Sequence, residues 1–245
     1  MRSPLWPLRR DIFKMYSSAL IKKWYPFFHA FLVRHTHAYQ TLFSEIASEI
    51  KTTDYPRHLP ALIVPSSTGE ILSVIKDSCH PWWGVDSNLE CLKKCSEQTD
   101  NFRPIPTDLN QGWPFEKNIF GLSLSIHALH FLSNPALLLK GIYESLAPGG
   151  LAIFVTFRGE GNVGEELVKS LLRIRLEKGL FETLNILPWK VFDSLMLNMS
   201  TEQHHFWTKE SFRQLLVENR FIIRSISHVF NGYSILASCH KETIK

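Results

Sequence analysis

Long apolar runs and CxxC pairs are missing from this 245-residue sequence. It has no run of about 18 apolar residues free of charge, so we expect no helix that spans a bilayer. The four cysteines, Cys79, Cys91, Cys95 and Cys239, are too few and too scattered for a disulfide scaffold, and they favour a reducing, cytoplasmic location. Cys91 and Cys95 are four residues apart, but without a CxxC or a paired-histidine motif we predict no metal site.

Acidic residues are scarce at the start of the chain. Before Ser44 there are seven lysines and arginines but a single acid, Asp11. The remainder is close to neutral, and the net charge is only +4. A nucleic-acid-binding face usually needs a denser basic surface, so we expect no nucleic-acid partner.

The same basic segment is rich in aromatic residues. Five of its apolar side chains recur close to one stripe of a helix: Ile21, Trp24, Phe27, Phe28 and Phe31. Such a stripe packs on the protein's own core, or it docks a protein partner or a membrane surface. An Arg-rich, acid-poor start is also typical of organelle presequences, so a mitochondrial or membrane-peripheral location stays open beside the cytoplasmic one.

Length and composition favour one large α/β domain with a small accessory element. Hydrophobic residues make up 44% of the chain and charged residues 20%, which argues for a well-formed core. We expect residues 1–50 to be a helical extension, or lid, and residues 51–245 to be the main domain. An irregular or helical insert is expected at about 180–200.

The segment 122–157 predicts a strand, a helix and a second strand. Its first residues are small and apolar, and Asn134-Pro135 then precedes a helix-length run. One face of that run carries four apolar side chains: Leu137, Leu138, Ile142 and Leu146. Pro148-Gly149-Gly150 stops the helix, and 151–157 is a second strand. Two strands joined through a helix pair in parallel with a right-handed crossover.

The remaining elements follow from the same apolar patterns. Further strands are expected at 61–64, 82–85, 102–106, 221–230 and 233–239. Further helices are expected at 10–34 with a bend near Pro26, 36–50, 70 to about 78, 88–98, 165–178 and 209–219. Asn231-Gly232 predicts that the last two strands form an antiparallel hairpin.

Polar residues follow the first three strands where a ligand would bind. In an open parallel sheet, ligands lie beyond the carboxyl ends of the strands, at the point where the strand order reverses. The turn 66–69, Asp86 and Asp108 occupy these ends. A carboxylate after the second strand can accept both hydroxyls of a ribose, although Asp86 could instead cap the helix that follows it.

Three stretches together resemble the class I S-adenosylmethionine-dependent methyltransferases. They read GVDSNLECLKKC, TDLNQGWPFEKNIF and SLSIHALHFLSNPALLLKGIYESLAPGGLAIFVTF. The resemblance is greatest to the small-molecule and carrier-protein group, such as quinone-biosynthesis and malonyl-carrier-protein methyltransferases. It implies a Rossmann-like, mostly parallel seven-stranded sheet that ends in an antiparallel hairpin, with N-terminal helices. It also implies S-adenosylmethionine as cofactor, contacted by Ser66, Ser67, Gly69, Asp86, Asp108 and Leu109.

The first loop departs from that family's pattern. The family carries an acid on strand one followed by Gly-x-Gly-x-Gly, and here Ile63 stands at the acid, Pro65 at the first glycine and Ser67 at the second. Only Gly69 remains. Proline also removes a backbone donor. Three functions therefore stay open: a methyltransferase, an inactive methyltransferase-like subunit for assembly or partner binding, or the same fold used to bind a different nucleotide or to catalyse a cofactor-assisted rearrangement without methyl transfer.

His127 and His130 follow the fourth strand and are candidates for a catalytic base. If the reaction is methyl transfer by in-line displacement, a base is needed only when the acceptor must lose a proton. The alternative is a helix start at which one histidine packs and the other is solvated. The resemblance implies a small or carrier-bound apolar acceptor.

Overall fold

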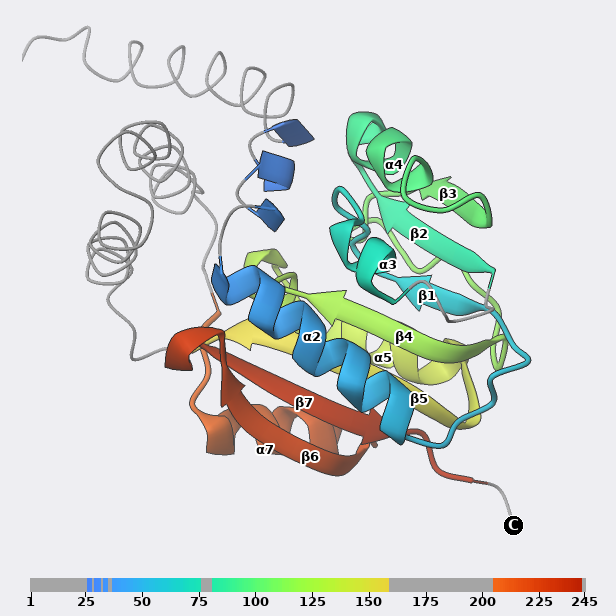
Figure 1. The fold of residues 1–245 in the computed structure, drawn as a ribbon. Coiled ribbons are helices and arrows are strands. Elements are labelled where there is room, and N and C mark those ends of the chain that lie inside the picture. The colour runs from blue at the N-terminus through green and yellow to red at the C-terminus, as the bar shows by residue number, and fades with distance from the viewer. Residues whose placement is uncertain are drawn as a thin grey trace, which may run out of the picture.

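The computed structural model describes residues 26–27, 29–31, 33–34, 37–75, 81–158 and 205–243. These residues form a twisted sheet with helices on both faces (Figure 1). α2 crosses one face, and α5 and α7 cover the other (Figure 1). Within these ranges no helix is long and apolar enough to cross a membrane.

The helices and strands follow one another as in an α/β protein. The helices are α2 (His37–Thr52), α3 (Glu70–Val74), α4 (Leu89–Ser96), α5 (Pro135–Ser145) and α7 (Lys209–Glu218), with short 3-10 turns η1 (Leu129–Phe131) and η2 (Phe230–Gly232). The strands are β1 (Ala61–Ile63), β2 (Trp82–Asp86), β3 (Phe102–Pro106), β4 (Phe120–Ile126), β5 (Leu146–Phe157), β6 (Ile222–Val229) and β7 (Ser234–His240).

The seven strands lie in the order β3-β2-β1-β4-β5-β7-β6. β1 to β5 run parallel, and β7 runs antiparallel between β5 and β6. The predicted fold class, a mostly parallel seven-stranded sheet that ends in an antiparallel hairpin, is confirmed. Asn231 and Gly232 both have positive φ in the turn of that hairpin, as the Asn-Gly prediction requires.

Two hydrophobic cores cover the two faces of the sheet, because successive strand residues point to opposite sides. One cluster joins α2 to the sheet and includes Leu42, Ile46, Ile63, Leu124 and Ile153. The other joins α5 and α7 to the opposite face and includes Leu62, Leu139, Phe154, Phe212 and Ala237. All three residues of β1 are buried, since the strand is covered on both faces. This explains why all three are apolar.

The predicted strand–helix–strand unit is present, with one difference at the end of its helix. Leu138 and Ile142 of α5 are buried as expected, but Leu137 is 56% exposed. Leu146 was expected on the helix and instead begins β5, where it pairs with Phe120 of β4. A shift of register follows that pair, so the Pro-Gly-Gly stretch lies inside the strand. The helix therefore ends at Ser145, before the Pro-Gly-Gly stretch and one residue before the last apolar residue expected on it.

Several predicted segments lie outside the described residues. These are 10–25 of the first helix, the helix at 165–178 and the insert at 181–199. The described residues between 26 and 34 are helical, with Val33 in the α2-side core, Phe31 half-buried and Phe27 62% exposed. The domain boundary at residue 50 stays a prediction, although α2 itself packs into the core of the sheet.

Candidate functional site

The sheet order reverses between β1 and β4, so the carboxyl ends of these strands frame the expected ligand position. The turn after β1 lies here, and its backbone is tightly constrained. Ser67 and Gly69 have φ values of +47° and +72°. A Cβ added to Gly69 would lie 2.4 Å from Sγ of Cys95 and 2.9 Å from its Cα, so only glycine fits. The backbone amide of Ser66 donates to Val85 across 2.7 Å and ties the turn to β2.

Asp86 holds this turn from the β2 side. Its Oδ2 accepts a hydrogen bond from the Ser67 amide and its Oδ1 one from the Asn88 amide, both at 2.9 Å. Burial raises the pKa of the Asp86 carboxyl, and the backbone hydrogen bonds oppose that rise. The N-terminal cap of α4 is Asn88 and not Asp86: the Asn88 side chain accepts a hydrogen bond from the Glu90 amide.

Asp108 and Leu109 lie after β3, next to the end of β2. The Thr107 amide donates to the Asp86 carbonyl across 3.1 Å, which joins the two strand ends. The Asp108 carboxylate accepts hydrogen bonds from the Asn110 amide at 3.0 Å and from Nε2 of Gln111 at 3.2 Å, so it shapes its own loop. Leu109 packs against the α5-side core.

His127 follows β4 and lies among aromatic rings. Its backbone is left-handed, with φ of +50°. Its ring stacks on Phe157 at 4.2 Å between centroids, and the rings of Tyr39 and Phe230 approach it edge-on. Nε2 lies 3.0 Å from Oγ of Ser234, whereas Nδ1 is shielded from solvent and has no hydrogen-bond partner among the described residues. Burial, and to a smaller extent the nearby histidines, lower the pKa of His127 well below its usual value.

His130 lies on η1 with its side chain fully buried. Its ring meets Phe157 edge-on, with centroids 4.7 Å apart. Both histidine rings take part in the aromatic cluster around Phe157. This differs from the alternative of a helix start with one histidine packed and the other solvated.

A polar cluster that the sequence did not predict joins the segment before α2 to the β1–α3 turn. Nδ1 of His29 lies 2.9 Å from Oγ1 of Thr68 and 3.2 Å from Oγ of Ser67. The Thr68 hydroxyl donates to Oε2 of Glu70, and Nε of Arg34 lies 4.0 Å from Oε1 of Glu70. Because His29 is 38 residues from Ser67 in sequence, no local pattern could have indicated this contact.

Tyr39 of α2 links the two halves of the site. Its ring centroid lies 6.2 Å from that of His29 and 6.0 Å from that of His127. A hydrogen bond therefore joins Ser67 to Asp86, and the Thr107 amide brings Asp108 beside them. The ring of Tyr39 connects this group to His127, because it lies near the rings of both His29 and His127.

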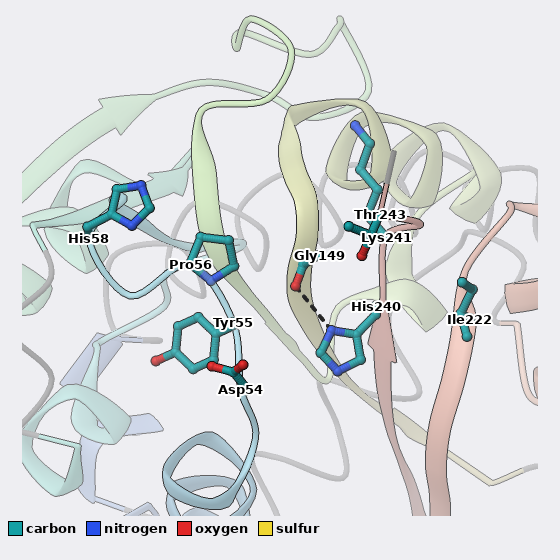
Figure 2. A pocket seen from close by; sticks show the side chains of 9 residues that line it. All are labelled: Asp54, Tyr55, Pro56, His58, Gly149, Ile222, His240, Lys241 and Thr243. Atoms are coloured by element: carbon teal, nitrogen blue, oxygen red, sulfur yellow. Dashed lines mark hydrogen bonds between the residues drawn. The ribbon is translucent and has the colours of Figure 1, made fainter. Parts of the chain in front are cut away.

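A hollow of about 480 Å³ (Figure 2) lies elsewhere, at the amino ends of the parallel strands. It opens between the loop that holds Tyr55, the start of β5 at Gly149 and the end of β7 at His240. There His240 donates from Nδ1 to the Gly149 carbonyl across 3.2 Å (Figure 2). None of the predicted site residues lines this hollow.

Residues 63–154, from the end of β1 to the middle of β5, match the family described as a methyltransferase domain. Over this stretch the chain is similar to a methyltransferase domain. The match includes the β1–α3 turn, Asp86, Asp108 and both histidines after β4. A comparison with curated protein sequences finds no match.

Solved structures share the fold of this chain at low sequence identity. A chain from the complex of the Haloferax volcanii Trm112 methyltransferase activator with a putative methyltransferase has a TM-score of 0.62 and 12% identity, covering 89% of this chain and 97% of that one. A Thermotoga maritima methyltransferase, described as a possible histamine N-methyltransferase, has a TM-score of 0.59 and 13% identity, with 91% and 99% covered.

A third structure contains a ligand of the expected class. The Burkholderia thailandensis 1,6-didemethyltoxoflavin N1-methyltransferase, solved with bound 1,6-didemethyltoxoflavin and S-adenosylhomocysteine, has a TM-score of 0.60 and 13% identity, with 93% of this chain and 89% of that one covered. At such identities the likeness shows a common fold, and the chemistry of this chain has to be argued from its own residues.

Proposed function

We propose that this chain binds S-adenosylmethionine beyond the ends of β1 and β2 and transfers its methyl group to a small or carrier-bound apolar acceptor. The observation that carries the proposal is the Asp86 carboxylate, which belongs to the last residue of β2 and contacts the β1–α3 turn through the Ser67 amide. This is the place where open α/β sheets bind nucleotides, and the bound S-adenosylhomocysteine of the Burkholderia enzyme supports the same ligand class.

The residues present fit the adenosine half of the cofactor. The oxygens of Asp86 accept backbone amide hydrogens from Ser67 and Asn88, and a carboxylate has further lone pairs that can accept ribose hydroxyls. Asp108 and Leu109 follow β3 beside it, on the side where the adenine would lie. Gly69 keeps the turn close to the sheet. Ser66 serves through its backbone, since its side chain is buried.

The amino-acid half fits less well. Ile63, which stands where the family has an acid, is 3% exposed and belongs to the α2-side core. Pro65 has no amide hydrogen to offer. A ligand with an ammonium group therefore finds no carboxylate on β1 of this chain.

When bound, the cofactor supplies an electrophilic methyl group, and the protein contributes mainly proximity and orientation. We assign the role of proton acceptor to His127. In the tautomer in which Nε2 donates to Oγ of Ser234, Nδ1 carries the lone pair, and the lowered pKa keeps the ring neutral near pH 7. An acceptor that must lose a proton would give it to Nδ1. His130 would pack behind Phe157 and hold the cluster in shape.

Calorimetric titration with S-adenosylhomocysteine tests the proposal. We expect binding to wild type and a loss of affinity of about 10-fold or more in Asp86→Asn, because a charged hydrogen-bond acceptor is removed. Asp100→Asn is the matched control, since that acid is exposed. A folded wild-type protein that shows no binding at millimolar ligand would overturn the proposal.

A second function, a methyltransferase-like subunit without catalysis, is favoured by the loss of the strand-one acid and of the Pro65 donor. In that case the fold serves as a scaffold for a protein partner. The Haloferax neighbour was solved in complex with a protein activator, which supports partner binding as a use of this fold. This alternative would be favoured by a fully folded wild-type protein that does not bind the cofactor and that does not gain binding when Pro65 and Ser67 are replaced by glycine.

A further inference from the structure

The described residues of the segment 26–34 are anchored at both ends on the sheet domain that follows. At the start of the segment, Nζ of Lys94 on α4 lies 4.2 Å from the centre of the Phe27 ring and 3.5 Å from the Pro26 carbonyl oxygen. Near its end, Val33 is buried in the α2-side core. These residues are therefore a packed part of the fold, although they precede the stretch that matches the family.

Between these anchors, the segment contacts the β1–α3 turn at a residue with an unfavourable backbone conformation. Nδ1 of His29 lies 3.2 Å from Oγ of Ser67 and 2.9 Å from Oγ1 of Thr68. Ser67 has φ of +47°, in the left-handed region that residues with a side chain disfavour. A residue keeps such a conformation only when its surroundings hold it there.

Two contacts of Ser67 come from different parts of the chain. From the β2 side, Oδ2 of Asp86 accepts a hydrogen bond from the Ser67 amide across 2.9 Å. From the segment before α2, His29 contacts the Ser67 hydroxyl. The amide of this residue orients the carboxylate that is proposed to accept the ribose hydroxyls. The geometry at the ligand position therefore depends on the N-terminal segment as well as on the sheet.

Serine makes the turn dependent on such contacts. The family's pattern has a glycine at the position of Ser67, and glycine adopts a positive φ at little steric cost. A serine in the same conformation needs contacts from outside the turn to offset that cost.

A second link between the segment and the turn runs through Glu70, the first residue of α3. Its Oε2 accepts a hydrogen bond from the Thr68 hydroxyl, and its Oε1 lies 4.0 Å from Nε of Arg34. The Arg34 side chain is 59% exposed, so this ion pair contributes less than the contact of His29.

We propose that the docked segment 26–34 sets the affinity of this chain for its cofactor, with His29 as a positioning residue that holds Ser67 in the left-handed conformation. This inference rests on the proposed function. When the segment undocks, Ser67 relaxes and its amide leaves Asp86. A change in the N-terminal part of the chain is thereby transmitted to the ligand site without a contact to the ligand.

Calorimetric titration with S-adenosylhomocysteine measures the effect on affinity. We expect His29→Ala to weaken binding about 5-fold to 10-fold, because the conformational cost of Ser67 is no longer offset. Ser67→Gly, added to His29→Ala, should restore the affinity to within about 2-fold of wild type, because glycine needs no such contact. Ser67→Gly alone should have little effect, so the two substitutions are not additive. His58→Ala, at an exposed histidine, is the control.

Hydrogen exchange of the Ser67 amide tests the same role in the ligand-free protein. We expect His29→Ala to raise its exchange rate about 10-fold, because the bond to Asp86 opens more often. The Ser66 amide, which donates to the Val85 carbonyl across 2.7 Å, is the internal control and should change less than about 2-fold. An equal change at both amides would show that the turn opens as a whole and would contradict the role of Ser67.

Lys94→Ala loosens the start of the segment and leaves every side chain of the turn in place. It should raise the exchange rate of the Ser67 amide by a smaller factor than His29→Ala, and it carries the test if thermal unfolding shows that His29→Ala is not folded. Unchanged S-adenosylhomocysteine binding in folded His29→Ala, or a loss that Ser67→Gly does not restore, overturns the role of His29. A wild-type protein that binds no S-adenosylhomocysteine overturns the proposed function, whereas the exchange rates still decide whether the segment holds the turn.

Discussion

The β4–α5–β5 unit and the β1–α3 turn differ in what determines their structure. The unit is held by apolar side chains on both faces of the sheet, with Phe154 and Leu139 fully buried. The turn is held by polar contacts: the Ser67 amide donates to the Asp86 carboxylate, and the Thr68 hydroxyl donates to the Glu70 carboxylate. An apolar unit tolerates changes that keep its volume and pattern, whereas a polar turn depends on each partner. The fold can therefore persist while the ligand chemistry at its edge changes.

The largest effect is expected in the apolar unit. Phe154→Ala removes a fully buried ring from the α5-side core and should lower the free energy of unfolding by about 3–5 kcal/mol. Leu137→Ala, on the exposed face of α5, should change it by less than about 0.5 kcal/mol. Urea unfolding measures both. Equal effects of the two substitutions would mean that this unit is not the stable half of the molecule.

A smaller but substantial loss is expected at the turn. Gly69→Ala combines a left-handed backbone with a Cβ that would collide with Cys95, so we expect about 2–4 kcal/mol of destabilisation. Gly232→Ala is the control, because its φ is +87° and nothing lies within 4 Å of an added Cβ. It should cost only about 1–2 kcal/mol. A smaller loss at Gly69 than at Gly232 would show that the turn is loosely packed.

The smallest effect concerns pH. The folded-state pKa of His127 is lowered, so below the usual value of 6.5 the unfolded chain binds a proton that the folded chain does not. Stability is therefore greatest above pH 6.5 and falls as the pH drops through the window between the two pKa values. Asn tolerates the left-handed backbone, so His127→Asn should remain folded and lose less stability than wild type between pH 7.5 and 5.0.

We expect that difference to be on the order of 1 kcal/mol. It is measured as the change in urea midpoint of the two proteins at the two pH values. An identical pH dependence in wild type and His127→Asn would show that folding leaves the pKa of His127 unchanged, and would weaken its assignment as a proton acceptor that is kept neutral by burial.

The sequence predicts the strands and helices well where burial is periodic and turn chemistry is local. The Asn231-Gly232 hairpin and the helix after Asn134-Pro135 are examples, since each depends on neighbouring residues alone. Leu146 was misplaced because an apolar residue at helical spacing also suits a buried strand, and only its pairing with Phe120 decides between them.

The candidate site is less accessible from sequence. Asp86 could be identified because a strand end precedes it directly. The His29 contact, by contrast, depends on how the segment before α2 lies on the sheet, and the aromatic cluster around His127 brings together rings from α2, β5 and η2. These contacts join residues far apart in the chain, so they follow from packing and not from local pattern.

β3, at one edge of the sheet, has a consequence for association between molecules. The Thr107 amide points toward β2, so the amide positions of Pro104 and Pro106 face the open edge. Proline has no hydrogen to donate there. A strand from another molecule would find these two donors absent along the length of β3, which opposes edge-to-edge aggregation. The prolines thus hinder the pairing of a further strand with β3.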